Sequence, residues 1–113
     1  MLINLVPDFF AVIDSVDPVA TYDDYFRAHQ RILRAYWQNY VVDPDGPHYT
    51  DVVRATVTAP HDDLRRMLAQ TDVVALARTT EEHCRALLAL DADLDIALMV
   101  GVGAANAGEL VVN

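Results

Sequence analysis

Residues 96–113, IALMVGVGAANAGELVVN, contain the pattern on which the fold prediction depends. The first five residues are continuously apolar, which is typical of a strand covered on both faces. A link rich in glycine follows, and then a second apolar run, ELVV, at residues 109–112. Because glycine and asparagine tolerate positive φ angles, the link suits a turn. The stretch therefore predicts a C-terminal strand–turn–strand.

The glycines of this link do not match a phosphate-binding loop. A dinucleotide fingerprint requires G-x-G-x-x-G or A, and after Gly101 and Gly103 the third position is Asn106. A phosphate site also needs a helix N-terminus behind the loop, whereas residues 109–112 have a strand pattern. The chain contains no lysine for a P-loop. We therefore expect a turn or a bulged hairpin link here, rather than a nucleotide site.

A further strand is predicted at the other end of the sequence, in LINLV at residues 2–6. Pro7 would end this strand because it cannot donate to a sheet. Two strands that bracket helices can be parallel neighbours joined by a right-handed helical crossover. The fold class is therefore α/β or α+β, with three or four helices packed on a small sheet. A chain of 113 residues can bury one modest core, so we expect residues 1–113 to form a single domain.

The strongest helical pattern begins at Thr21 and should end near Val41. Apolar and aromatic side chains recur there at intervals of three and four, which places them on one helix face, and we expect that face to be core rather than a ligand box. The face consists of Tyr22, Tyr25, Phe26, His29, Ile32, Leu33, Tyr36, Trp37 and Tyr40. Thr21 and Asp24 resemble a capping box. Residues 8–18 fit either a strand or a helix.

The segments after residue 51 include one that fits two structures and two that are predicted to be helical. Residues 52–58, VVRATVT, fit a short strand or a linker, and a helix should begin near Pro60. A third helical region covers residues 72–90, with a break at Thr79–Thr80 where a new cap is available. In the second helix the inward side chains would be Leu64, Met67 and Leu68. In the third helical region the apolar stripe would be His83, Cys84, Leu87 and Leu88.

The charge balance limits the classes of partner. Seventeen acidic and eight basic residues give a net charge of −9, which repels nucleic acid and anionic membrane surfaces. No apolar run approaches the roughly 20 residues that span a bilayer, and the first residues lack a secretory signal pattern. The lone Cys84 excludes an internal disulfide. We predict an acidic, soluble, cytoplasmic protein that binds neither nucleic acid nor membrane.

The histidines and the cysteine do not form a catalytic or metal-binding pattern. Zinc sites commonly have two ligands one helical turn apart, and His29, His48, His61 and His83 are scattered. We expect His29 and His83 to pack on apolar faces with one hydrogen bond, and His48 and His61 to be solvated. Cys84 has no activating base nearby in the sequence and is expected to be a small buried hydrophobe. We assign no catalytic, metal or cofactor-binding residue.

The order of the segments resembles the amino-terminal region of a family of predicted zinc-dependent peptidases of zincin type. The resemblance rests on LINLV, the aromatic helix YDDYFRAHQRILRAYWQNY, further helices and IALMVGVGAANAGELVV. In this family a strand, a glycine-containing turn and a second strand precede the helix with the HExxH signature. No HExxH occurs in this sequence, so the resemblance places neither zinc ligands nor a glutamate base here. It implies that zinc would be bound only by an HExxH helix following Asn113.

Two functions follow from these observations. In the first, the chain is the leading part and scaffold of a zinc-dependent peptidase, and an extended peptide adds as a strand to a sheet edge beside the cleft. In the second, it is a small acidic, non-catalytic protein-interaction module. The module would self-associate as a homo-oligomer, because a terminal edge strand leaves unpaired backbone groups for a protein or peptide partner. The edge consists of Glu109, Leu110, Val111 and Val112.

Overall fold

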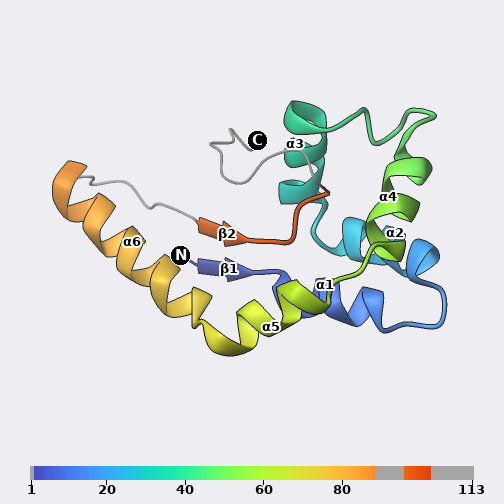
Figure 1. Cartoon of the computed structure of the whole chain (residues 1–113). Coiled ribbons are helices and arrows are strands. Elements are labelled where there is room, and N and C mark those ends of the chain that lie inside the picture. Colours follow the sequence, from blue (N-terminus) through green and yellow to red (C-terminus); the bar gives the residue numbers. More distant parts are fainter. Residues whose placement is uncertain (1, 89–95, 103–113) are drawn as a thin grey trace. The chain divides into compact units, whose positions relative to one another are not determined.

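The computed structural model describes residues 2–88 and 96–102 (Figure 1). This part of the chain is mostly helical, with six helices and one small parallel sheet of two strands. In chain order the elements are β1 (Leu2–Asn4), α1 (Val6–Ile13), α2 (Pro18–Ala28), α3 (Gln30–Tyr40), α4 (Tyr49–Thr58), α5 (Asp62–Gln70), α6 (Val73–Leu88) and β2 (Ile96–Leu98). The fold is α+β in this coarse sense, and it has more helices than the three or four predicted.

The chain divides into two compact units. In its described part, unit 1 consists of residues 2–5, 60–88 and 96–99, and therefore holds both strands, α5 and α6. Unit 2 consists of residues 6–59 and 100–102, and holds α1 to α4. The prediction that residues 1–113 form a single domain stays a prediction.

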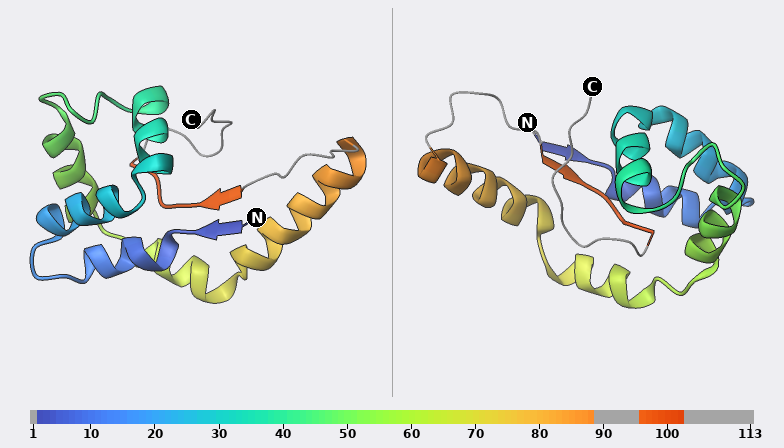
Figure 2. Two further views of the ribbon diagram at one scale, coloured as in Figure 1. Left: turned by 180° about the vertical axis from the view of Figure 1, so that it is seen from behind. Right: turned by 90° about the horizontal axis from the view of Figure 1, so that it is seen from above.

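The sheet of unit 1 joins segments from opposite ends of the sequence. β1 and β2 lie side by side and parallel, and Ile3 is opposite Ala97 in the register (Figure 2). The N–H of Leu5 extends the ladder by donating to the carbonyl of Leu98 across 2.8 Å. The predicted parallel pairing of these two apolar segments is confirmed. Both strands are shorter than the predicted residues 2–6 and 96–100.

Pro7 lies in the first turn of α1 instead of closing a strand. The helix begins at Val6, so the predicted strand LINLV loses its last two residues and the ambiguous segment after it starts as helix. Proline suits this place because its fixed φ is helical and its missing N–H would have no partner in a first turn. Phe9 and Val12 point into the core of unit 2, at 0% and 2% exposure.

The long aromatic helix predicted from Thr21 to Val41 is two helices, α2 and α3. They meet at His29, whose φ of −120° and ψ of 26° depart from helical values. The start was also misplaced, since Asp17 caps α2 by accepting from the N–H of Ala20. The Thr21 hydroxyl instead donates to the carbonyl of Asp17 within the helix. The predicted end is confirmed, because α3 ends at Tyr40 with Val41 as its C-cap.

The apolar stripe on α2 and α3 does form the core of unit 2. Its buried members are Tyr22, Tyr25, Phe26, Leu33, Tyr36 and Trp37. Inside it, the indole N–H of Trp37 donates to the hydroxyl of Tyr22 at 3.2 Å. α4 packs against α2 and replaces the short strand or linker predicted for residues 52–58. Its Val53 and Val57, one helical turn apart, are both buried.

In unit 1, α6 differs from the prediction in its continuity and in which of its side chains are exposed. α6 runs without a break through Thr79–Thr80, and the Thr80 hydroxyl donates to the carbonyl of Leu76 within it. His83 is exposed and Leu87 is 84% exposed, so the predicted apolar stripe is wrong for both residues. Cys84, in the same helix, is half-buried. Among the described residues, the sheet that packs against α6 has two strands of three residues each, and these do not cover His83 and Leu87.

α5 departs from its prediction in the same way. Met67 was expected to face inward and is 48% exposed, whereas Leu64 and Leu68 are half-buried. The predicted second strand of the C-terminal strand–turn–strand, including Glu109, Leu110, Val111 and Val112, lies outside the described residues. Its pairing therefore stays a prediction, and β2 is the described part of that motif.

Candidate functional site: the edge of the sheet and the face of α6

The outer edge of β2 carries a pair of backbone groups that its neighbour does not use. In a parallel ladder, the N–H and C=O of one residue point to the partner strand and those of the next residue point away. The Leu98 carbonyl accepts from Leu5, so Ile96 and Leu98 face β1, and Ala97 directs its N–H and C=O to the opposite side. No described residue pairs with Ala97 on that side, where Figure 1 draws no further arrow.

The side chains around this edge are small or apolar. Ala97 is exposed, and its neighbours Ile96 and Leu98, which point to the other face of the strand, are half-buried. α6 packs against both strands, so the sheet has helical support in unit 1. The edge can therefore accept an extended segment through main-chain hydrogen bonds, without a charged side chain of its own obstructing it.

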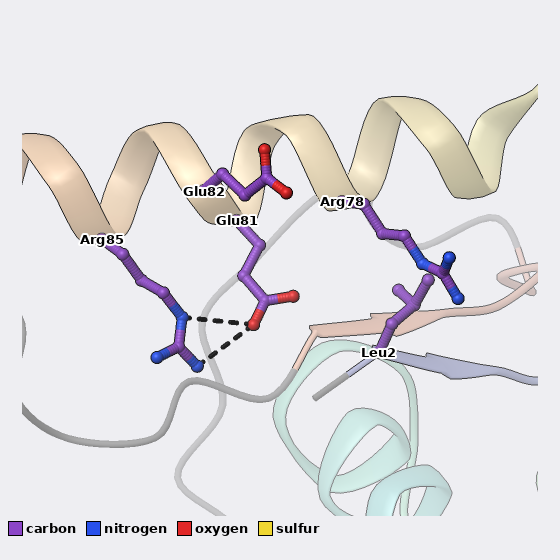
Figure 3. A pocket seen from close by; sticks show the side chains of 5 residues that line it. All are labelled: Leu2, Arg78, Glu81, Glu82 and Arg85. Atoms are coloured by element: carbon purple, nitrogen blue, oxygen red, sulfur yellow. Dashed lines mark hydrogen bonds and ion pairs between the residues drawn. The ribbon is translucent and has the colours of Figure 1, made fainter.

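A shallow pocket lies between β1 and the sheet-facing side of α6. It has a volume of about 410 Å³ and is lined by Leu2, Arg78, Glu81, Glu82 and Arg85 (Figure 3). Two guanidinium groups and two carboxylates are present, so the lining is balanced in charge at neutral pH. The Arg78 side chain extends toward Leu2. The pocket contains no thiol, hydroxyl or imidazole, and these lining residues supply no nucleophile of the usual kinds.

An ion pair orders one side of this pocket. Both Nε and Nη2 of Arg85 donate to Oε1 of Glu81, at 3.3 Å and 3.1 Å. The Glu81 side chain is only 15% exposed. Partial burial would raise the pKa of its carboxyl, but hydrogen bonds and positive charges, those of Arg85 included, outweigh burial and hold the pKa below its usual value. Glu81 is therefore a fixed anion, unsuited to proton transfer near neutral pH.

The histidines lie apart from this site and from one another. His29 is hydrogen-bonded through Nε2 to Asp8 at 2.9 Å, which is the single partner expected for it. His48 is exposed as expected, whereas His61 is half-buried, and each precedes a helix. His83 lies on the exposed side of α6. Within residues 2–88 and 96–102, no three His, Cys, Asp or Glu residues are grouped to hold a metal ion.

The buried tyrosines of unit 2 have strongly raised pKa values. Burial raises the pKa of Tyr22 to about 12, against the opposing effect of its hydrogen bond from Trp37. Burial also raises the pKa of Tyr25 and of Tyr49, and the Asp23 carboxylate that accepts from Tyr49 raises the latter further. All three hydroxyls stay protonated at neutral pH. They belong to the core and offer no general base.

The hydroxyl oxygen of Tyr25 is an unusual polar atom of that core. The Tyr25 hydroxyl is buried and has no hydrogen-bond partner among the described residues, although its ring packs on His29 at a centroid distance of 5.4 Å. A buried hydroxyl without a partner lowers stability. It lies in packed aromatic surroundings, and we treat it as a stability feature.

Comparison with known proteins gives no match. No family model, no curated protein and no solved structure is significantly similar to this chain. None of the described helices is both long and apolar enough to cross a membrane. The site must therefore be interpreted from its own geometry.

Sequence reasoning did not identify Ala97 or the α6 pocket as site residues. The spacing of Glu81 and Arg85 is the i, i+4 spacing of a helical ion pair, which was available as a signal in the sequence. No such signal exists for Ala97, because the direction of its N–H and C=O depends on the register with β1.

Proposed function

We propose that this chain is the non-catalytic scaffold of a zinc-dependent peptidase. The observation that carries the proposal is the parallel pairing of β1 and β2, with α6 packed against both strands. The sequence resemblance requires a sheet strand followed by a glycine, and β2 is followed by Gly101 in this way. In this proposal the sheet supports the substrate cleft and the metal helix comes from another part of the protein.

The chemistry of such an enzyme would be supplied outside these residues. An HExxH helix places two histidines on one face, where they bind zinc, and the glutamate activates the metal-bound water. The Glu81–Arg85 pair and the charged pocket on α6 would be structural parts of the scaffold. The role left for this chain is to position a sheet edge where an extended peptide could add as a strand.

The test is to extend the reading frame beyond Asn113 and to purify the product that it encodes. The proposal expects an HExxH sequence within several tens of residues, about one zinc ion per chain, and peptide hydrolysis that is lost when the glutamate of the motif is changed to glutamine. The 113-residue chain alone serves as the control and should bind no stoichiometric zinc. A reading frame without the motif, or zinc bound by the short chain, would refute the proposal.

The outward N–H and C=O of Ala97, which no described residue pairs with, favour a second candidate, the small acidic interaction module. The described buried residues of the core are all apolar or aromatic, so the charges lie at the surface. Such a module would bind its partners by strand pairing, or its net charge of −9 would attract partners that have basic surfaces. A reading frame that stops without a metal motif would leave this function in place of the peptidase.

A further inference from the structure

We propose that the pocket between β1 and α6 binds a small zwitterion, a molecule with one carboxylate and one ammonium group such as a free amino acid or a dipeptide. Arg78 holds the carboxylate, Glu82 holds the ammonium group, and Leu2 contacts an apolar side chain of the ligand. All the residues that line this pocket are described residues of unit 1. The inference concerns a non-catalytic binding site and does not depend on the peptidase assignment.

The pocket is lined by two pairs of opposite charges with i, i+4 spacing on α6, and the two pairs behave differently. Glu81 and Arg85 form an ion pair at 3.1 Å. Arg78 and Glu82 have the same spacing, but neither side chain makes a hydrogen bond or ion pair with any residue that the structure describes (Figure 3). The order with the acid first is the more favourable one on a helix, which accounts for the difference. Within the described lining, one guanidinium and one carboxylate are therefore available to a ligand.

The charges of the lining favour a zwitterion over a simple ion. Arg78 and Glu82 are both exposed, so a ligand can reach them from solvent. A simple anion at Arg78 would be repelled by the carboxylates of Glu81 and Glu82, and a simple cation at Glu82 would be repelled by the guanidinium groups of Arg78 and Arg85. A zwitterion places the opposite charge at each available group. Both contacts are charge-assisted hydrogen bonds, and a guanidinium can bind a carboxylate through two parallel bonds.

The size and the apolar wall of the pocket agree with a small ligand. Its volume of about 410 Å³ is near the lower end of the roughly 300–1,000 Å³ of small-molecule sites. The Arg78 side chain extends toward Leu2, so a carboxylate bound at Arg78 has its neighbouring apolar group close to Leu2 (Figure 3). The pocket is shallow and its charges are exposed, so binding should be weak and should weaken further as salt screens both contacts.

The experiment is an NMR titration of the 113-residue chain at low salt, first with leucine and in parallel with glycyl-leucine, to compare an amino acid with a dipeptide. We expect saturable shifts of the Leu2, Arg78 and Glu82 signals with at least one of the two. Leucinamide lacks the carboxylate and N-acetyl-leucine lacks the ammonium group, so each should bind about tenfold more weakly than leucine. The absence of saturable binding of both leucine and glycyl-leucine, or equal affinity for leucine and its two blocked forms, would overturn the proposal.

Two variants test which residue holds which end of the ligand. Arg78→Gln should lose the preference for leucine over leucinamide, and Glu82→Gln should lose the preference for leucine over N-acetyl-leucine. Both side chains are exposed, and the amide spectrum of each variant shows directly that it is folded. Arg54→Gln is the matched control, because it removes one exposed arginine from α4 in unit 2 and should bind leucine as the parent does. A folded Arg78→Gln chain that still prefers leucine to leucinamide, or an equal loss of binding in Arg54→Gln, contradicts the assigned site.

Discussion

The indole Nε1–H of Trp37 donates a hydrogen bond to the hydroxyl of Tyr22, across 3.2 Å between α3 and α2. Both residues are almost completely buried, at 0% and 1% exposure. Because water cannot replace either partner there, this bond links two helices that the sequence pattern had suggested were one. The nearby hydroxyl of Tyr25 differs, because it is buried and has no hydrogen-bond partner within residues 2–88 and 96–102.

This contrast predicts opposite outcomes for two chemically identical substitutions. Tyr22→Phe leaves the buried N–H of Trp37 without an acceptor and should lower the free energy of unfolding by about 1–3 kcal/mol. Tyr25→Phe removes a hydroxyl that has no partner in the described part of the chain, so it should be neutral or slightly stabilising. Urea denaturation followed by tryptophan fluorescence measures both, with each variant as the control for the other. Equal losses in the two variants would contradict the assigned hydrogen bond.

The raised pKa of Tyr22 predicts how stability changes in alkali. Burial raises its pKa from 10 in the unfolded chain to about 12 in the fold. The contribution is fully present below pH 10 and is lost as the pH rises from 10 through 12, because the unfolded chain ionises first. Two pKa units correspond to roughly 3 kcal/mol.

Unfolding in urea at a series of alkaline pH values would measure this loss, and tyrosinate absorbance would follow the ionisation. Tyr22→Phe removes the group and should show a shallower decline over the same range. An ordinary pKa of 10 for every tyrosine in the folded chain would contradict the burial of Tyr22.

In unit 1, the Glu81 carboxyl predicts an effect at acid pH. Its pKa is held low, with Arg85 among the causes, so its contribution to stability is present above the pKa of the unfolded chain and is lost as the pH falls through the folded value. Arg85→Ala should therefore move the Glu81 pKa upward, toward its usual value. A carboxyl NMR titration measures this shift. Arg66→Ala, which breaks an exposed pair with Asp63 on α5, is the control and should leave Glu81 unchanged.

The parallel sheet was predictable because the apolar pattern that indicates each strand lies within one short segment. Two apolar runs at opposite ends of the sequence, each too short for a helix of its own, leave few arrangements other than neighbouring strands. The split at His29 was not predictable, since the three-and-four spacing of aromatic residues continues across it. For α4, the β-branched residues at 52–58 favour a strand by propensity, but burial of Val53 and Val57 on one helical face overrides that preference.

The candidate site also has one part that the sequence predicts and one part that it does not. The strand that contains Ala97 was predicted from its apolar character, whereas the outward direction of its N–H and C=O required the register with β1. The exposed side of α6 was mistaken for an inward stripe because His83 and Leu87 have helical spacing. Spacing identifies residues on a common face, and only the neighbouring elements determine whether that face is covered.

The continuity of α6 leads to a final prediction. The sequence offered a new cap at Thr79–Thr80, but the helix passes through both residues and the Thr80 hydroxyl bonds back to the carbonyl of Leu76. Thr80→Pro would remove an interior N–H and clash with the preceding turn, at a cost of about 3 kcal/mol. If a second helix began there, proline would be tolerated in its first turn. Thermal unfolding compares the variant with Thr80→Ala, which keeps the backbone bond and should change stability little. Equal stability of the proline and alanine variants would indicate that α6 is broken at Thr80 after all.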